Sequence, residues 1–446
     1  MLASMRRVIG LAALALASAS WAATAYDFGN PGPDEEWMRQ CIHRARLDPE
    51  AEADRLGIVN AHADDVPDGA YDVGEGLDTL AGVPNQRIYW SRYQGPRGPL
   101  AWSKALNAAA YNHADDMYFY NHWSHYTGPN SRHGYVQGDA PWDRVWKEGY
   151  PNHYAGENLA KNNGVGDPTA ADTHAALYID EGVSGRGHRT NMLHHRWREI
   201  GVGYVTGPPI GGWTDYWAIE FASDAFYADA ADPWPVTDTV YLTGVVFDDT
   251  GDGLYQPGEQ VAGAYVWAWQ DGGAQLAHYA VTADGGGYSV PLLDAAGDDL
   301  LEGQAVRVIV FDPVAEKYLQ AVRTVAAADV IWEETSGDPP DSDPLRLNIG
   351  LDVTGAQMIP AIDGDADFNG KVELADLSTL AFHWQMAPDA TWLDGNFDND
   401  GDVDLADLSA LAFNWGAGAA DGAAPEPAGA LLMIAGAAVL RRRRRA

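Results

Sequence analysis

The sequence predicts a multi-domain protein: a mixed α/β domain, then an antiparallel β-sandwich, then a small pair of helices. Its 446 residues suffice for two to four domains. A proline-rich stretch at 231–235 separates long helical patterns from short alternating runs with Gly/Asp turns. Near the C-terminus, Gly370–Trp384 returns as Gly401–Trp415, 31 positions later, which marks a duplicated unit.

The composition indicates folded modules and disfavours some partners. Hydrophobic residues make up 46% of the chain and there are 17 tryptophans, too many for a disordered protein. A formal net charge of −36 repels nucleic acid and anionic lipid. We therefore expect no nucleic-acid partner and interpret the carboxylates as calcium ligands and a solvating surface. The one cysteine, Cys41, permits no intramolecular disulfide, and its helical, apolar setting favours a core residue over a nucleophile.

The first 25 residues have the features of a secretory signal peptide. Arg6 and Arg7 form a basic start, Val8–Ala19 is apolar, and Ala23–Ala25 offers small residues for cleavage. The apolar run is shorter than the roughly 20 residues that a membrane span needs. We therefore expect export and removal of 1–25 rather than a permanent N-terminal anchor.

The α/β domain is predicted from its mixture of helical and strand periodicities. Apolar residues recur at helical spacing in three segments, at 34–57, 103–120 and 169–180. Strand patterns follow at 200–205 and 216–222, and the stretch 58–99 is rich in loop-forming residues.

Five short motifs in this domain carry its candidate site. They are Trp123-Ser124-His125, Gly156-Glu157-Asn158, Tyr178–Glu181, Gly187–Asn191 and Glu199–Gly203. Their order resembles the CAP (SCP) family over about residues 34–227. The resemblance implies an α-β-α sandwich whose cleft holds two histidines and two acidic residues, which here are His125, Glu157, Glu181 and His188.

The chemistry of these four residues leaves several roles open. His125 and His188 could bind zinc or a similar transition metal, with the carboxylates as ligands or as acceptors that orient the rings. A carboxylate beside such an ion could act as a general base, so all four are candidate catalytic residues. Alternatively, the histidines hydrogen-bond the carboxylates and hold the cleft shut. Because Asp180 directly precedes Glu181, either one could face the cleft.

Residues 239–352 predict the β-sandwich, which we interpret as a spacer. Seven short runs separated by Gly/Asp turns are typical of this architecture; they lie at 240–247, 264–269, 277–282, 287–292, 305–311, 320–325 and 345–352. An acidic turn at 248–253, with Glu259 following, resembles the calcium-binding prealbumin-like repeats of bacterial surface adhesins. Asp248, Asp252 and Glu259 are therefore candidate calcium ligands, and a plain acidic hairpin loop is the alternative.

The duplicated unit at 363–416 has the spacing of EF-hand-like calcium loops. Oxygen-bearing side chains stand at loop positions 1, 3, 5 and 12, glycine at 6, and a backbone carbonyl at 7 completes the set. The first loop supplies Asp365, Asp367, Asn369, Lys371 (backbone) and Asp376, and the second supplies Asn396, Asp398, Asp400, Asp402 (backbone) and Asp407. The pair resembles a dockerin, which implies a cohesin-like partner. A calcium-stabilised stalk without a partner is the alternative.

The C-terminal segment 425–446 resembles a PEP-CTERM sorting signal. Pro425-Glu426-Pro427 precedes the uncharged run Ala428–Leu440, and five arginines follow. Such a tail pauses in the membrane with its arginines inside, so its association with the membrane is transient, until an exosortase-type enzyme cuts it. A permanent tail anchor is the alternative. The resemblance implies the cell surface or extracellular matrix of a Gram-negative-type bacterium.

These predictions support two functions from different classes. The first is an exported binding protein whose cleft holds a lipid, glycan or peptide and whose calcium modules display it. The second is a metal-assisted hydrolase of peptides or polysaccharides, recruited through the dockerin-like unit. The sequence contains no HExxH motif, no GxSxG motif and no evident Cys–His pair, so we favour binding and leave enzymatic activity open.

Overall fold

A computed structural model describes most of the chain. The described residues are 23–58, 98–151, 155–181, 183, 186–194, 197–223, 239–270, 276–294, 296–298, 300, 303–325 and 349–418. The predicted sorting tail, the proline-rich break and residues 1–22 of the signal peptide lie outside them. Within the described ranges, no helix has both the length and the apolar character needed to cross a bilayer.

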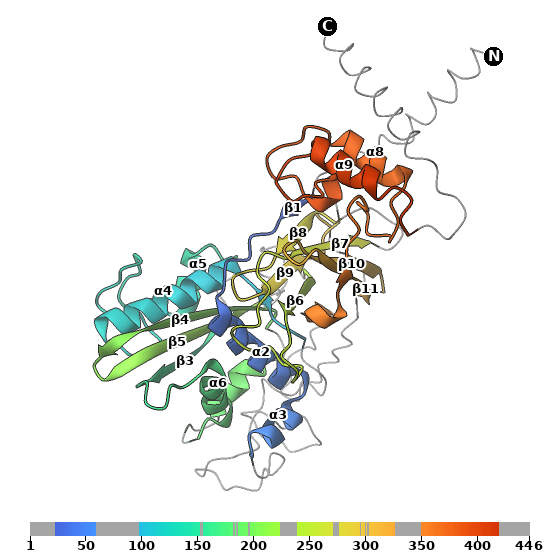
Figure 1. Ribbon diagram of the computed structural model, residues 1–446. Coiled ribbons are helices and arrows are strands. Elements are labelled where there is room, and N and C mark those ends of the chain that lie inside the picture. Colours follow the sequence, from blue (N-terminus) through green and yellow to red (C-terminus); the bar gives the residue numbers. More distant parts are fainter. Residues whose placement is uncertain are drawn as a thin grey trace, which may run out of the picture.

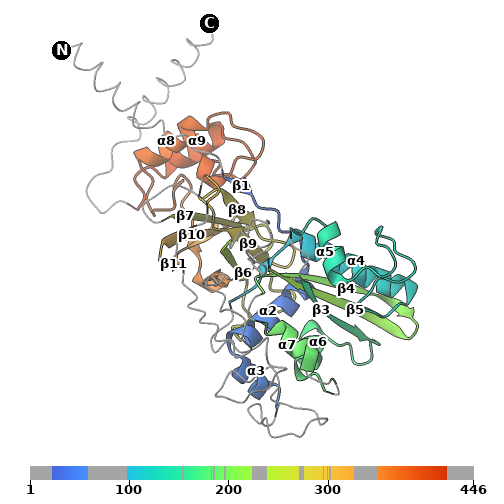
Figure 2. The same cartoon turned by 180° about the vertical axis from the view of Figure 1, so that it is seen from behind.

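The α/β part consists of a four-stranded sheet with helices on both faces (Figures 1 and 2). The strand order is β2-β4-β5-β3, with β2 at Ala101–Trp102, β4 at Glu199–Ile210, β5 at Trp213–Ala222 and β3 at Ala155–Asn162. One face carries α4 (Lys104–Tyr120) and α5 (Pro141–Lys147). The other carries α2 (Pro33–Leu47), α6 (Ala170–Ile179) and α7 (Gly187–Met192).

Local signals explain where the helices begin and end. The helical pattern at 34–57 is interrupted, because Asp48 caps a second helix, α3 (Pro49–Arg55), and Pro49 occupies its first turn. Thr169 caps α6, and Asp180 ends it in the left-handed region at φ 52°. That turn places the Asp180 side chain at the edge of the sheet.

Two glycines of β4 let α4 lie directly on the sheet. A Cβ atom on Gly201 would lie 2.1 Å from the backbone of Leu106, and one on Gly203 would lie 2.3 Å from the backbone of Ala110. Neither position tolerates a side chain, since the obstacle is helix backbone. The glycines of the Glu199–Gly203 motif therefore serve close packing.

The second part contains two facing sheets. The larger has the order β1-β8-β7-β10-β11-β14, and the smaller has the order β12-β6-β13 with β9 also paired to β6. Their strands are β1 (Thr24–Ala25), β6 (Tyr241–Phe247), β7 (Tyr265–Gln270), β8 (His278–Val281), β9 (Gly287–Pro291), β10 (Ala305–Asp312), β11 (Lys317–Thr324), β12 (Ile349–Gly350), β13 (Val353–Thr354) and β14 (Ile359–Pro360). Strand β1 adds residues from the predicted cleavage site to the larger sheet, parallel to β8.

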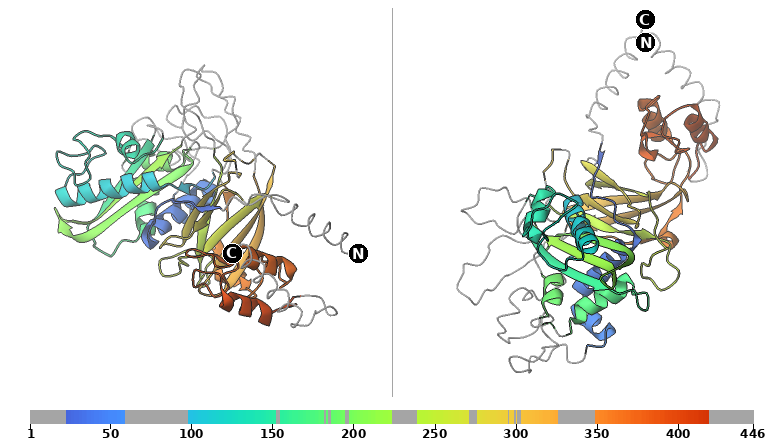
Figure 3. Two further views of the ribbon diagram at one scale, coloured as in Figure 1. Left: turned by 90° about the horizontal axis from the view of Figure 1, so that it is seen from above. Right: turned by 90° about the vertical axis from the view of Figure 1, so that its left-hand side faces the viewer.

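The larger sheet is covered on both faces. Along β10, Val306, Val308 and Val310 pack into the core shared with the smaller sheet, whereas Ile309 and Phe311 pack toward the C-terminal helical module. This alternation is the period of a strand. The helical module, residues 361–418 with α8 (Leu374–Phe382) and α9 (Leu405–Phe413), therefore lies against the sheet (Figures 1 and 3).

Helix α2 joins the two larger parts. The buried side chain of Arg39 forms an ion pair with Glu36 at 2.6 Å and donates hydrogen bonds to Thr243 Oγ1 and Gly244 O of β6. The indole of Trp102 donates to the same glutamate at 2.8 Å. A single hydrophobic core runs from the α/β part into the sandwich. The part with the two sheets is thus packed against the α/β part through a buried polar cluster.

Candidate functional site

The first histidine–carboxylate pair, His125 with Glu157, lies on the face of the sheet that α4 and α5 cover. His125, in the loop after α4, donates from Nδ1 to Glu157 Oε1 at 2.7 Å. The carboxylate can only accept, so the hydrogen is on Nδ1 and the lone pair is on Nε2. The His125 side chain is half exposed while Glu157 is buried. A buried carboxylate thus orients a partly exposed imidazole.

Arg144 of α5 holds this pair in place. Its guanidinium lies 2.5 Å from Glu157 Oε2 and donates to the backbone carbonyl of His125 at 2.9 Å. A second buried carboxylate, Glu220, faces Glu157 across the β3–β5 pairing and lies 3.5 Å from Arg144. The cluster therefore contains two carboxylates and one guanidinium, sealed from solvent.

Burial and neighbouring charges shift the pKa values of Glu157 and Glu220 in opposite directions. Burial favours the neutral form of Glu157, but Arg144, His113 and His125 outweigh it and lower the pKa to about 2. Burial and the nearby negative charge of Glu157 raise the pKa of Glu220 well above its usual value. Burial also lowers the pKa of His113 to about 4. Within the cluster, Glu157 therefore ionises far more readily than Glu220.

The second histidine–carboxylate pair, His188 with Asp180, lies on the face that carries α7. His188 of α7 donates from Nδ1 to Asp180 Oδ1 at 2.7 Å, and its backbone N–H donates to Asp180 Oδ2 at 2.9 Å. Glu181 is exposed, so Asp180 is the residue that holds His188. Asn158, whose amide bonds to the His188 carbonyl, points away from the Glu157 face because neighbouring strand residues alternate. The two pairs therefore flank the edge strand β3.

The geometry does not assemble the four residues into one ligand shell. Among the described residues, neither His125 nor His188 belongs to a set of three or more metal-capable side chains with ligand atoms within 4.8 Å. Each histidine has one carboxylate partner and its own Nε2 lone pair. The two histidines thus have separate carboxylate partners, and a shared metal or a single cleft stays a prediction.

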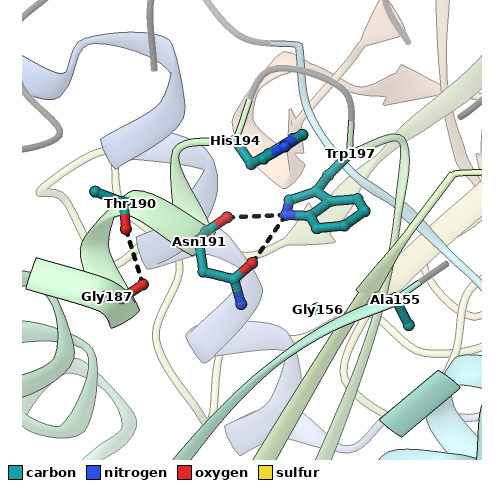
Figure 4. Close-up of a pocket in the computed structure, with 7 residues that line it drawn as sticks. All are labelled: Ala155, Gly156, Gly187, Thr190, Asn191, His194 and Trp197. Carbon is teal, nitrogen blue, oxygen red and sulfur yellow. Dashed lines mark hydrogen bonds between the residues drawn. The ribbon is translucent and has the colours of Figure 1, made fainter. Parts of the chain in front are cut away.

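A cavity with a volume of ≈ 210 Å³ lies between β3 and α7. Figure 4 shows the residues around it: Ala155, Gly156, Gly187, Thr190, Asn191, His194 and Trp197. The Trp197 indole donates to the carbonyl and amide oxygens of Asn191, which fixes that wall. Gly187 borders open space, so the cavity combines amide, hydroxyl and imidazole groups with an open backbone surface.

The first calcium-type loop has its carboxylates together. Asp365, Asp367 and Asp376 bring ligand oxygens within 4.8 Å of one another. Asp365 accepts from the backbone N–H groups of Asn369 and Gly370, which wraps the loop around the carboxylates. Gly370 has φ 80°, in the left-handed region that position 6 requires. The arrangement fits a hard divalent cation.

The second loop differs in which carboxylates lie close together. The group within 4.8 Å is Asp402, Asp404 and Asp407. Oδ1 of Asn396, at position 1, is buried and has no hydrogen-bond partner among the described residues, as expected for a ligand oxygen. Asp404 stands at position 9, often a ligand position through water, and the prediction omitted it.

The acidic turn of the sandwich is closed by its own hydrogen bonds. Both carboxylate oxygens of Glu259 accept backbone N–H groups, from Thr250 and from Gln256. Asp252 accepts from the backbone of Leu254. In the described chain, Asp248, Asp252 and Glu259 do not form one of the three-ligand groups. Calcium at this turn stays a prediction.

Helices on both faces of a four-stranded sheet, with two histidine–carboxylate pairs at its edge strand, define the class of this domain. Residues 92–221 match the sequence profile of the CAP family, described as the Cysteine-rich secretory protein family. The protein therefore contains a CAP domain. The profile does not reach α2 and α3, although α2 packs on the same sheet.

One solved structure that matches is an extracellular protein containing an SCP domain from Bacillus anthracis str. Ames. It shares 25% sequence identity with a TM-score of 0.20, and the match covers 27% of this chain. The chain thus spans 33% of the length of that structure. No curated protein matches.

Proposed function

We propose that this protein is exported and that its CAP domain binds a small polar group in the cavity between β3 and α7. The observation that supports this is the cavity itself, which is lined by the polar side chains of Thr190, Asn191 and His194. Its ≈ 210 Å³ is below the roughly 300–1,000 Å³ of sites for drug-sized ligands. A sugar ring or a peptide side chain fits this size better than a lipid tail.

The experiment fills the cavity by placing a larger side chain at Gly187, where the surrounding atoms leave room for it. A Cβ atom on Gly187 would meet nothing within 4 Å, so Gly187→Leu projects into open space without disturbing the backbone. The purified chain is screened on glycan and peptide arrays, and the best binder is titrated by calorimetry. We expect Gly187→Leu to weaken binding at least tenfold, whereas Ala176→Leu on the exposed side of α6 leaves it unchanged. If both variants bind the ligand with equal affinity, the cavity is not the binding site.

A hydrolase is the second candidate, and the two oriented histidines favour it. Each donates Nδ1–H to a carboxylate and keeps an Nε2 lone pair, which is the form needed for a general base or for a zinc ligand. Zinc would be held at Nε2 of His125 or His188. A screen of peptide and polysaccharide hydrolysis, with and without zinc, tests this. Activity that survives the double change His125→Ala with His188→Ala would count against it.

We further propose that calcium fills the two loops of the helical module and that this module and the sandwich display the CAP domain at the cell surface. The two carboxylate groups and the unpaired Asn396 oxygen support the calcium. A cohesin-like protein is the proposed partner, and an exosortase-type enzyme is the proposed processing enzyme. Mass spectrometry of surface-exposed protein would detect the tail segment 428–446 only if that processing does not occur.

A further inference from the structure

A third group of polar side chains lies apart from both histidine pairs and from the calcium-type loops. Asp115 and Asp116 stand near the end of α4, and His133 stands in the loop 121–140 that follows it. One ligand atom from each of the three lies within 4.8 Å of the others. Metal ligands on bonds of about 2.0–2.2 Å lie about 3–4 Å apart, so only a small adjustment would assemble them.

Arg132 binds one oxygen of each carboxylate. Asp115 Oδ1 accepts from the Arg132 guanidinium at 3.1 Å, and Asp116 Oδ1 accepts from the Arg132 backbone N–H at 2.7 Å. The second oxygen of Asp115, Oδ2, is hydrogen-bonded to His133 Nε2 at 2.8 Å, which brings the imidazole to the carboxylates. Arg132 thus organises both carboxylates while occupying only one oxygen of each.

The second oxygen of Asp116 is the decisive observation. Asp116 is only 4% exposed, and its Oδ2 is buried with no hydrogen-bond partner in the described part of the chain. A buried carboxylate oxygen that is left unsatisfied is costly. This unsatisfied oxygen belongs to a carboxylate that is grouped with an imidazole nitrogen and a second carboxylate.

We propose that Asp115, Asp116 and His133 bind a divalent first-row transition-metal ion, of which zinc and manganese are the chemical matches. Two carboxylates and one imidazole suit such ions better than calcium, which prefers oxygen alone. Two carboxylates against one guanidinium leave a formal charge of −1 for a cation to neutralise. The side chains of Asp115 and His133 are 12% and 24% exposed, so an ion can enter from solvent and water can complete its shell.

Such an ion would restrict the motion of the loop 121–140, which contains His125. The first half of the loop is held by His113, whose Nε2 lies 2.9 Å from Ser124 O. The second half is held by Arg132, whose guanidinium also lies 4.5 Å from the centre of the Phe119 ring. Metal at His133 would add a third point and restrict the loop around the first histidine pair.

The test is a zinc and a manganese titration of the full exported chain by calorimetry. Calcium is kept saturating to fill the oxygen-rich loops, and the background carries His125→Ala with His188→Ala so that the histidine pairs cannot bind. We expect one equivalent of at least one metal to bind. His133→Ala should lower its affinity at least tenfold, and His278→Ala, which removes a histidine of the sandwich, should not.

Asp116→Asn is the second variant, because the amide oxygen can still accept from the Arg132 backbone while the charge is lost. It should weaken the same binding at least tenfold without changing the melting temperature in metal-free buffer. The proposal is overturned if neither metal binds this background, or if both variants bind as tightly as the His278→Ala control.

Discussion

At the scale of single residues, Arg144 determines how the first histidine pair is built. It ties the backbone of His125 to the carboxylate of Glu157 and also neutralises the buried charge. Glu220 shares this environment, but burial and the charge of Glu157 raise its pKa, because one guanidinium does not stabilise two ionised carboxylates there. The two glutamates have the same side chain and pKa values shifted in opposite directions, so their substitutions should differ.

We predict that Glu157→Gln destabilises the protein by about 3–5 kcal/mol, since it leaves Arg144 buried without its ion-pair partner. Glu220→Gln replaces a neutral acid with a neutral amide and should change stability by no more than about 1 kcal/mol at pH 7. Urea unfolding of the two variants beside the wild type measures both. Equal losses would show that Glu220 is ionised.

The same pair gives a pH dependence with a definite sign. The folded protein binds the Glu220 proton more tightly than the unfolded chain does, because the folded pKa is raised. Stability contributed by this group is therefore lost as pH rises above about 4.5. Glu220→Gln should flatten the decline of unfolding free energy between pH 5 and pH 8, which parallel denaturant titrations would reveal. An unchanged slope would contradict the assignment.

At the scale of elements, the two calcium-type loops have the same spacing but different surroundings. Position 4 of the first loop is Phe368 and of the second is Asn399, and both have a positive φ. Phe368 is buried against Phe311 and Trp392, whereas Asn399 is exposed. The first loop is therefore part of an interface, and the second is open to solvent.

We predict two calcium sites in the helical module, each dependent on its own loop. Asp367→Ala should abolish the site of the first loop and Asp398→Ala that of the second, because each removes a carboxylate from position 3. At calcium about 100-fold above the dissociation constant, each site should add about 2.7 kcal/mol of stability. Calorimetric stoichiometry and melting with chelator measure this. Two remaining sites in either variant would contradict the ligand assignment.

At the scale of the whole molecule, the three parts share their cores. The α/β part and the sandwich meet across the buried Glu36–Arg39 pair. The sandwich and the helical module meet across an aromatic cluster that includes Trp267, Phe311 and Phe368. The helical module is consequently packed against the larger sheet of the same chain and shares a hydrophobic core with it.

We predict that Phe368→Ala costs about 3–5 kcal/mol and uncouples the helical module from the sandwich, because a large buried side chain is removed from the shared cluster. Asn399→Ala is the matched control at the same loop position with the same positive φ, and it should cost only the roughly 1–2 kcal/mol of an alanine in the left-handed region. Differential scanning calorimetry should show one transition in the wild type and a separate, earlier transition in Phe368→Ala. One unchanged transition in both variants would contradict the shared core.

Local sequence patterns predicted many of the helices, strands and motifs of this protein. The helix at 169–180 and most sandwich strands are found near their predicted positions, because capping, periodicity and turn residues act over a few neighbours. The order of motifs likewise predicted the CAP domain, and the repeat predicted the two acidic loops. Strand β3 escaped prediction, since its sequence Ala155–Asn162 is polar and lacks alternation.

Only the tertiary structure decided which of these groups meet. It selected Asp180 over the adjacent Glu181, because the left-handed turn after α6 directs the first toward His188 and leaves the second exposed. It also placed Glu220 opposite Glu157 and separated the two histidines across β3. These contacts join residues tens of positions apart, and strand pairing and core packing bring them together, neither of which a local pattern records.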